Sequence, residues 1–183
     1  KDDVLVELTA TPRVGVHRYT FRKPEQPHLL VDITSGIGKQ RCEEGVVLIK
    51  PSEQAIEGSV RIFGSFSGRY GGLDVYFAAG FSEPFAKYGT WKEGRPAPGT
   101  DGAAGKDIGA DLGFNAKTVE VRLALSYVAI ENARQNLQAE TAGKTFDQIV
   151  DEAKDAWEKR LAAIRIEGGS AKQQRIFYTN LYH

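Results

Sequence analysis

Few side chains in this sequence have a type and a spacing that could serve a chemical site. Trp91 lies at the edge of a stretch rich in Gly, Pro and Asp, residues 92–111. An indole in such a place can stack on a sugar ring, or it can anchor the loop as a hydrophobic residue. His17 lies beside Arg18 on an expected strand, which favours an exposed strand residue over a ligand contact. Trp91 and His17 are therefore the two candidate binding residues.

The remaining reactive side chains show neither the spacing of a metal site nor an activated nucleophile. His17, His28 and His183 are far apart in the sequence, and Cys42 is the single cysteine. We expect Cys42 to be a small buried or half-buried residue, because no partner that would activate it is visible. The stretch SGIGKQR, residues 35–41, lacks the earlier glycine and the following Ser or Thr of a phosphate-binding loop, so we expect a turn. The sequence thus predicts no catalytic residue and no metal ligand.

The elements that position these residues are mostly β-strands as far as about residue 130. VLVELTA and VGVHRYTF alternate apolar and polar residues around a TPRVG turn, which is typical of a hairpin. We expect residues 92–111 to be a long, exposed hairpin loop. Short strands without intervening helices predict an antiparallel β-sandwich. The expected strands cover residues 4–10, 14–21, 29–33, 45–50, 54–64, 73–81, 85–92 and 117–130.

The period of the apolar residues becomes helical after residue 130. Residues 131–140 predict a short helix, and Thr145 with Gln148 forms a capping box that opens a second one. Ser170 with Gln173 opens a third, terminal helix in the same way. We expect the second helix to present a core-facing apolar stripe of Phe146, Ile149, Val150, Ala153, Trp157, Leu161 and Ile164.

Composition and charge exclude some classes of protein. The chain has 183 residues, 41% hydrophobic, with 24 acidic and 24 basic side chains. This balance argues against a dedicated nucleic-acid-binding protein, which would carry a basic excess. No apolar run is long enough to span a bilayer.

Both ends of the chain are expected to be cut. The sequence contains no methionine and begins at Lys1 without a secretory signal pattern. The terminal helix reaches His183 with its apolar residues Ile176, Phe177 and Leu181 and without a stop signal. We expect a piece of a larger protein, in which another part covers these side chains.

Four blocks of the sequence, taken in order, resemble glycoside hydrolase family 92. They are VELTATPRVGVHRYTF (6–21), LALSYVAIENARQNLQAE (123–140), FDQIVDEAKDAWEKRLAAIRIEGG (146–169) and RIFYTNLYH (175–183). Together they cover nearly the whole chain. The family consists of exo-acting α-mannosidases, mostly α-1,2-specific, that are common in Bacteroidetes.

The resemblance implies a two-domain enzyme whose sandwich is of the galactose mutarotase type. Residues 1–130 would form that sandwich, incomplete at its N-terminus. Residues 131–169 would form a helical linker, and residues 170–183 the first helix of a missing (α/α)6 catalytic barrel. The family's acid, base and calcium ligands lie in that barrel. The resemblance therefore implies that this chain alone is inactive and that calcium binds outside it.

The function that the resemblance implies is the trimming of mannose from glycans with inversion, in a calcium-dependent enzyme. The implied partners are a mannose-containing glycan and the protein's own C-terminal barrel. An exported location, whether periplasmic, cell-surface or secreted, follows from the resemblance alone. The alternative is a stand-alone carbohydrate-binding or adhesive β-sandwich. That alternative requires the terminal helix to be covered by the rest of this chain.

Overall fold

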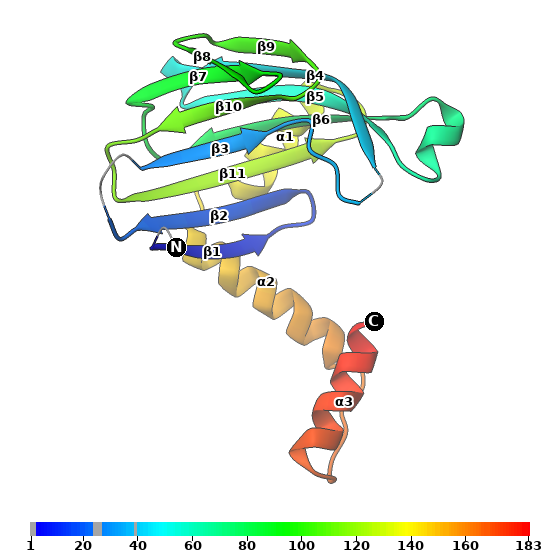
Figure 1. The fold of residues 1–183 in the computed structure, drawn as a ribbon. Coiled ribbons are helices and arrows are strands. Elements are labelled where there is room, and N and C mark those ends of the chain that lie inside the picture. The colour runs from blue at the N-terminus through cyan, green and yellow to red at the C-terminus, as the bar shows by residue number, and fades with distance from the viewer. Residues whose placement is uncertain (1–2, 24–26, 39) are drawn as a thin grey trace.

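The computed structural model describes residues 3–23, 27–38 and 40–183. Two antiparallel sheets face each other, and three helices follow the last strand (Figure 1). This is the mainly β, sandwich-like architecture that the short alternating strands predict. Lys39, in the predicted turn at residues 35–41, lies outside the described residues.

The larger sheet has seven strands in the order β1-β2-β11-β6-β5-β4-β9. The predicted hairpin is confirmed, because β1 pairs antiparallel with β2 from Val4↔Phe21 to Ala10↔Gly15. Two short 3-10 helices, Pro51–Glu53 and Ser67–Tyr70, lie in its connections. The strands are β1 (Val4–Ala10), β2 (Val14–Phe21), β4 (Arg41–Lys50), β5 (Ala55–Phe63), β6 (Leu73–Phe81), β9 (Gly102–Gly105) and β11 (Thr118–Ser126).

The smaller sheet has four strands in the order β3-β10-β7-β8. They are β3 (His28–Asp32), β7 (Lys87–Lys92), β8 (Arg95–Pro98) and β10 (Ile108–Gly113). The prediction of a long loop at residues 92–111 is therefore wrong. That segment forms β8 on the small sheet, crosses to the large sheet as β9 and returns to the small sheet in β10.

The main core lies between the two sheets and follows the two-residue period of the strands. In β10, Ile108, Ala110 and Leu112 are fully buried and belong to this core. In β11, Val119 and Val121 are buried in the same cluster. The residues of β10 that alternate with the buried ones face away from the core, on the outer side of the small sheet.

Helix α1 (Ile130–Thr141) packs on β11 and β6 of the large sheet (Figure 1). It therefore covers the outer face of the large sheet, on the other side of the sandwich from the small sheet. Arg122 of β11 fixes its C-terminal end, because the guanidinium donates hydrogen bonds of 2.6 Å to the carbonyl oxygens of Thr141 and Lys144. A cation at this end also complements the helix dipole. The helix predicted at residues 131–140 is confirmed.

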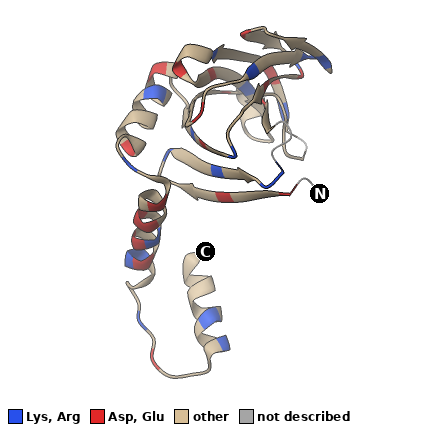
Figure 2. Cartoon of the chain, turned by 90° about the vertical axis from the view of Figure 1, so that its left-hand side faces the viewer, with Lys and Arg blue, Asp and Glu red and all other residues tan. Residues whose placement is uncertain are grey.

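Helix α2 (Phe146–Leu161) begins with the predicted capping box, in which the Gln148 backbone N–H donates to Thr145 Oγ1 over 3.2 Å. Only its first turn is anchored, since Phe146 and Ile149 are its buried residues. The rest of the helix extends away from the sandwich and carries charged residues along its length (Figure 2). The prediction that Trp157 faces a core is wrong, because its side chain is 50% exposed.

Helix α3 (Ala171–Tyr182) also has its predicted capping box, at Ser170 and Gln173. It contains no buried residue, and it contacts α2 through Trp157 and Tyr182, whose rings lie 4.7 Å apart. Among the described residues, no helix combines the length and the apolar character needed to cross a membrane.

Candidate functional site

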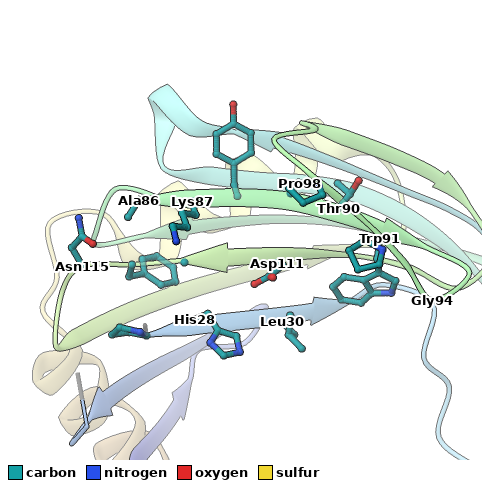
Figure 3. A pocket seen from close by; sticks show the side chains of 16 residues that line it. His28, Leu30, Ala86, Lys87, Thr90, Trp91, Gly94, Pro98, Asp111 and Asn115 are labelled. Atoms are coloured by element: carbon teal, nitrogen blue, oxygen red, sulfur yellow. The ribbon is translucent and has the colours of Figure 1, made fainter. Parts of the chain in front are cut away.

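The outer face of the small sheet carries a hollow of about 710 Å³ (Figure 3). This volume lies within the range of ligand pockets, roughly 300–1,000 Å³. All four strands of the small sheet and the residues that flank them contribute to it. The lining residues are Pro27, His28, Leu30, Ala86, Lys87, Tyr88, Gly89, Thr90, Trp91, Gly94, Pro96, Pro98, Asp111, Gly113, Phe114 and Asn115.

The strand register arranges the outward-facing side chains in three rows across the sheet. The first row contains Pro96, Trp91, Gly109 and Asp32. The second contains Pro98, Gly89, Asp111 and Leu30, and the third contains Lys87, Gly113 and His28. Each larger side chain of β7 or β10 thus lies opposite a glycine of the neighbouring strand.

Trp91 lies flat against the sheet at one end of the hollow (Figure 3). A Cβ added to Gly109 would meet the Cζ2 and Cη2 atoms of the Trp91 ring at 2.1 and 2.2 Å. The six-membered part of the indole therefore occupies the space above Gly109, where any other residue would hold a side chain. Trp91 stays half-buried, with the rest of its surface open to the hollow.

Asp111 lies near the middle of the hollow, between Trp91 and Asn115 (Figure 3). Its side chain is exposed, and its two cross-strand neighbours are Gly89 and Leu30. A carboxylate in such an open setting can accept hydrogen bonds from the hydroxyl groups of a ligand. It is the one acidic side chain among the residues that line the hollow.

The rim of the hollow near Trp91 is formed by β8, whose sequence is RPAP. Pro96 and Pro98 fit there because β8 is an edge strand, where a residue without an N–H leaves no ladder position empty. The two-residue turn before β8 consists of Glu93 and Gly94, both with positive φ, as tight hairpins require. This edge forms the wall of the hollow beside the indole.

His17, the other sequence candidate, does not line the hollow. It lies on β2 of the large sheet, where Nδ1 is 2.8 Å from the Tyr19 hydroxyl. The side chain is half-buried and not exposed as the sequence suggests, and this burial lowers the pKa of its imidazole. The structure thus separates the two candidate binding residues onto different sheets.

No group of three or more His, Cys, Asp or Glu side chains among the described residues could hold a metal ion. Cys42 is half-buried, and burial raises the pKa of its thiol, so this sulfur is poorly suited to act as a thiolate. No described residue is therefore assigned to a metal site.

Sequence reasoning missed Asp111, although the signal was present. IGADLG has apolar residues at positions 108, 110 and 112, which is the period of a half-buried strand. The surrounding glycines and aspartates favour a loop more strongly on composition alone. Trp91, by contrast, was a candidate from the sequence because an aromatic residue at the edge of a loop can stack on a sugar ring.

Comparison with protein families matches the chain in two parts. The family described as the glycosyl hydrolase family 92 N-terminal domain matches residues 1–126. The family described as the glycosyl hydrolase family 92 catalytic domain matches residues 132–183. The chain belongs to glycosyl hydrolase family 92. The hollow therefore lies in the part that matches the family 92 N-terminal domain, and α1, α2 and α3 lie almost entirely in the part that matches its catalytic domain.

Solved structures of other family 92 proteins share the fold of this one. The inverting mannosidase BT2199 of Bacteroides thetaiotaomicron VPI-5482 is 25% identical, with a TM-score of 0.85. The α-mannosidase BT3965 of Bacteroides thetaiotaomicron is 25% identical with a TM-score of 0.87, and the family 92 glycosyl hydrolase ccman5 is 28% identical with a TM-score of 0.85. Each similarity covers 98% of this chain and only 24–25% of the other. No curated protein matches the chain.

Proposed function

We propose that the chain is the N-terminal portion of an exo-α-mannosidase that trims terminal mannose from glycans. The observation that carries the proposal is the match to both family 92 domains, in order, along one chain. Two of the solved relatives are described as mannosidases, which supports mannose as the sugar. The α-1,2 preference and an exported location are part of the same proposal and rest on the family resemblance.

The proposed role of this portion is architectural. Helix α3 carries no acidic residue (Figure 2). It leaves Ile176 and Tyr182 about half exposed, at 52% and 55%. An apolar helix face of this kind is stable in water when another part of the protein covers it. The proposed partner is the remainder of the catalytic domain, an (α/α)6 barrel. The stand-alone alternative needs α3 to be covered by this chain, and α3 has no buried residue.

The proposed reaction inverts the anomeric centre, as in the relative described as an inverting mannosidase. One carboxylic acid protonates the leaving oxygen while a carboxylate on the other side activates water, the two standing roughly 6.5–9.5 Å apart. Calcium, with its preference for oxygen ligands, is proposed to help bind the mannose ring in the remainder of the enzyme. No described residue of this chain is assigned to any of these three tasks.

The proposal is tested by comparing two proteins, the 183-residue chain and a version extended through the rest of the catalytic domain. With α-1,2-mannobiose and calcium, we expect turnover by the extended protein and none by the chain alone. Proton NMR should show the β-anomer of mannose first, and a calcium chelator should reduce the rate. Turnover by the chain alone would place the reacting groups within it and overturn the assignment.

A further inference from the structure

We propose that the hollow on the outer face of the small sheet binds a pyranose unit of a glycan. Trp91 would stack on one face of the ring, and Asp111 would accept hydrogen bonds from its hydroxyl groups. The proposal rests on the proposed function in one respect only, the choice of mannose as the sugar. The geometry that supports a sugar ring as ligand is independent of that choice.

The spacing of the two residues suits a single sugar ring. Trp91 lies opposite Gly109, and Asp111 is two residues further along β10 on the same face. Such diagonal neighbours in an antiparallel pair are about 7–8 Å apart. A pyranose stacked on the indole can therefore direct its edge hydroxyls toward the carboxylate. Apolar C–H groups then meet the aromatic ring, while polar groups meet a charged acceptor.

The floor of the hollow is low enough for a ring to approach. Gly89 and Gly113 face outward and line the hollow, so no side chain projects from these two positions, while the Trp91 indole lies over Gly109. At Gly89 a Cβ would also lie 2.8 Å from the Ala97 carbonyl oxygen, so the close pairing with β8 requires glycine. The outer face of the small sheet is thus shaped as a shallow trough with an aromatic residue at one end.

The charges in the hollow favour a neutral ligand over an ion. Lys87 and Asp111 both line it, on adjacent strands and with opposite signs. A phosphate or carboxylate ligand would be attracted by Lys87 but repelled by Asp111, and a cationic ligand would meet the reverse, so neither sign of charge finds a uniformly attractive site. A neutral sugar can instead use both as hydrogen-bonding groups, since lysine donates and aspartate accepts.

The test exploits the presence of only two tryptophans, Trp91 and Trp157. Trp157→Phe leaves Trp91 as the sole indole, and its fluorescence reports on the hollow. Titration with methyl α-D-mannopyranoside and with α-1,2-mannobiose should give saturable changes. Saturation-transfer NMR on the same samples detects binding without relying on fluorescence. Absence of saturable binding by both methods at tens of millimolar sugar would overturn the proposal.

Variants then assign the binding to the two residues. Asp111→Ala should weaken binding about tenfold or more, the size expected for a hydrogen bond to a charged group. Trp91→Ala should also weaken binding, because the aromatic face on which the ring stacks is lost. Trp91→Tyr should retain most of it, because an aromatic face remains. Asp111 is exposed, so its variant keeps the fold even if Trp91→Ala does not. Lys154→Ala, on α2, is the matched surface control, and binding unchanged in both site variants would contradict the proposal.

A second measurement uses the extended protein. If a segment of the same protein covers the hollow, acrylamide will no longer quench Trp91 there, and that result would also overturn the proposal. Loss of mannosidase turnover in the extended protein bears on the proposed function alone, because sugar binding is measured on the chain without turnover. Binding of cellobiose in place of both mannosides would contradict the assignment of mannose.

Discussion

Arg134 of α1 donates two hydrogen bonds to the carboxylate of Glu57 on β5, one of 2.8 Å from Nε and one of 2.6 Å from Nη2. Glu57 is only 6% exposed, and Lys50 lies 3.0 Å from the same carboxylate. A buried carboxylate needs such partners, because an unpaired charge in the interior is costly. This contact joins α1, the helix that follows the sandwich, to β5 of the large sheet.

Glu57→Gln should lower the free energy of unfolding by about 1–2 kcal/mol, since charge-assisted hydrogen bonds become neutral ones. Urea unfolding at pH 7 measures the change. Asp151→Asn removes the charge from an exposed pair with Lys154 and should have almost no effect. If both substitutions changed the unfolding free energy equally, the buried ion pair of Glu57 would contribute no more to stability than the exposed pair of Asp151.

The same contact predicts a dependence on pH. The hydrogen bond from Arg134, with further help from Lys50, holds the pKa of Glu57 below its usual value. The stabilisation is therefore complete above the unfolded-state pKa of about 4.3 and is lost as the pH falls through the lower folded-state pKa. The difference in unfolding free energy between wild type and Glu57→Gln should shrink from pH 7 to pH 3. If this difference in unfolding free energy did not change with pH, the stabilisation would not come from the charged form of Glu57.

Gly109→Ala should disturb the hollow, because the new methyl group would lie about 2 Å from the Trp91 ring and 2.4 Å from the Val31 carbonyl oxygen. We expect a loss of about 1–3 kcal/mol in unfolding free energy and a shifted Trp91 emission maximum. Gly113→Ala is the matched control on the same strand and face, since its nearest contact, Lys87 Cβ, is at 3.4 Å. Similar losses from both would show that Trp91 does not occupy the space over Gly109.

The two capping boxes should differ in their effect, although their geometry is alike. Thr145→Ala should cost about 1 kcal/mol of global stability, because α2 begins at the buried Phe146. Ser170→Ala should fray α3 without changing the unfolding of the sandwich, since α3 buries no residue. Thermal unfolding and amide hydrogen exchange separate the two outcomes. Equal losses of global stability would mean that α3 unfolds together with the core.

The sequence predicts what is encoded by local periodicity. The hairpin at residues 4–21 and the capping boxes at Thr145 and Ser170 were predictable, because alternation and S/T-x-x-Q spacing act within a few residues. Trp157 was misplaced for a non-local reason. Its position on the α2 stripe is regular, but α2 leaves the sandwich after its first turns, so the stripe has no core to face.

The hollow could not be read from the sequence, because its parts come from separate segments. Leu30, Trp91 and Asp111 become neighbours only through the pairing of β3, β10 and β7. Residues 92–111 have the composition of a loop, although β8, β9 and the start of β10 lie in this stretch. β8 contains two prolines, which an edge strand tolerates, and β9 consists of glycine and alanine. Tertiary contacts decide which of the two sheets a short strand joins, and the local sequence pattern carries no information about them.

The exposed face of α3 gives a prediction that tests the proposed docking of this helix. Ile176 is 52% exposed, and the rings of Tyr182 on α3 and Trp157 on α2 are in contact. Ile176→Glu should leave the unfolding of the 183-residue chain unchanged, because no buried contact is lost. In the extended protein the same substitution should destabilise the catalytic domain, because a charge would replace an apolar side chain at a covered position. Lys172→Glu, on the same helix, controls for added negative charge. Equal tolerance of Ile176→Glu in both proteins would mean that this face stays open to water, and the proposed docking of α3 onto the rest of the barrel would be wrong.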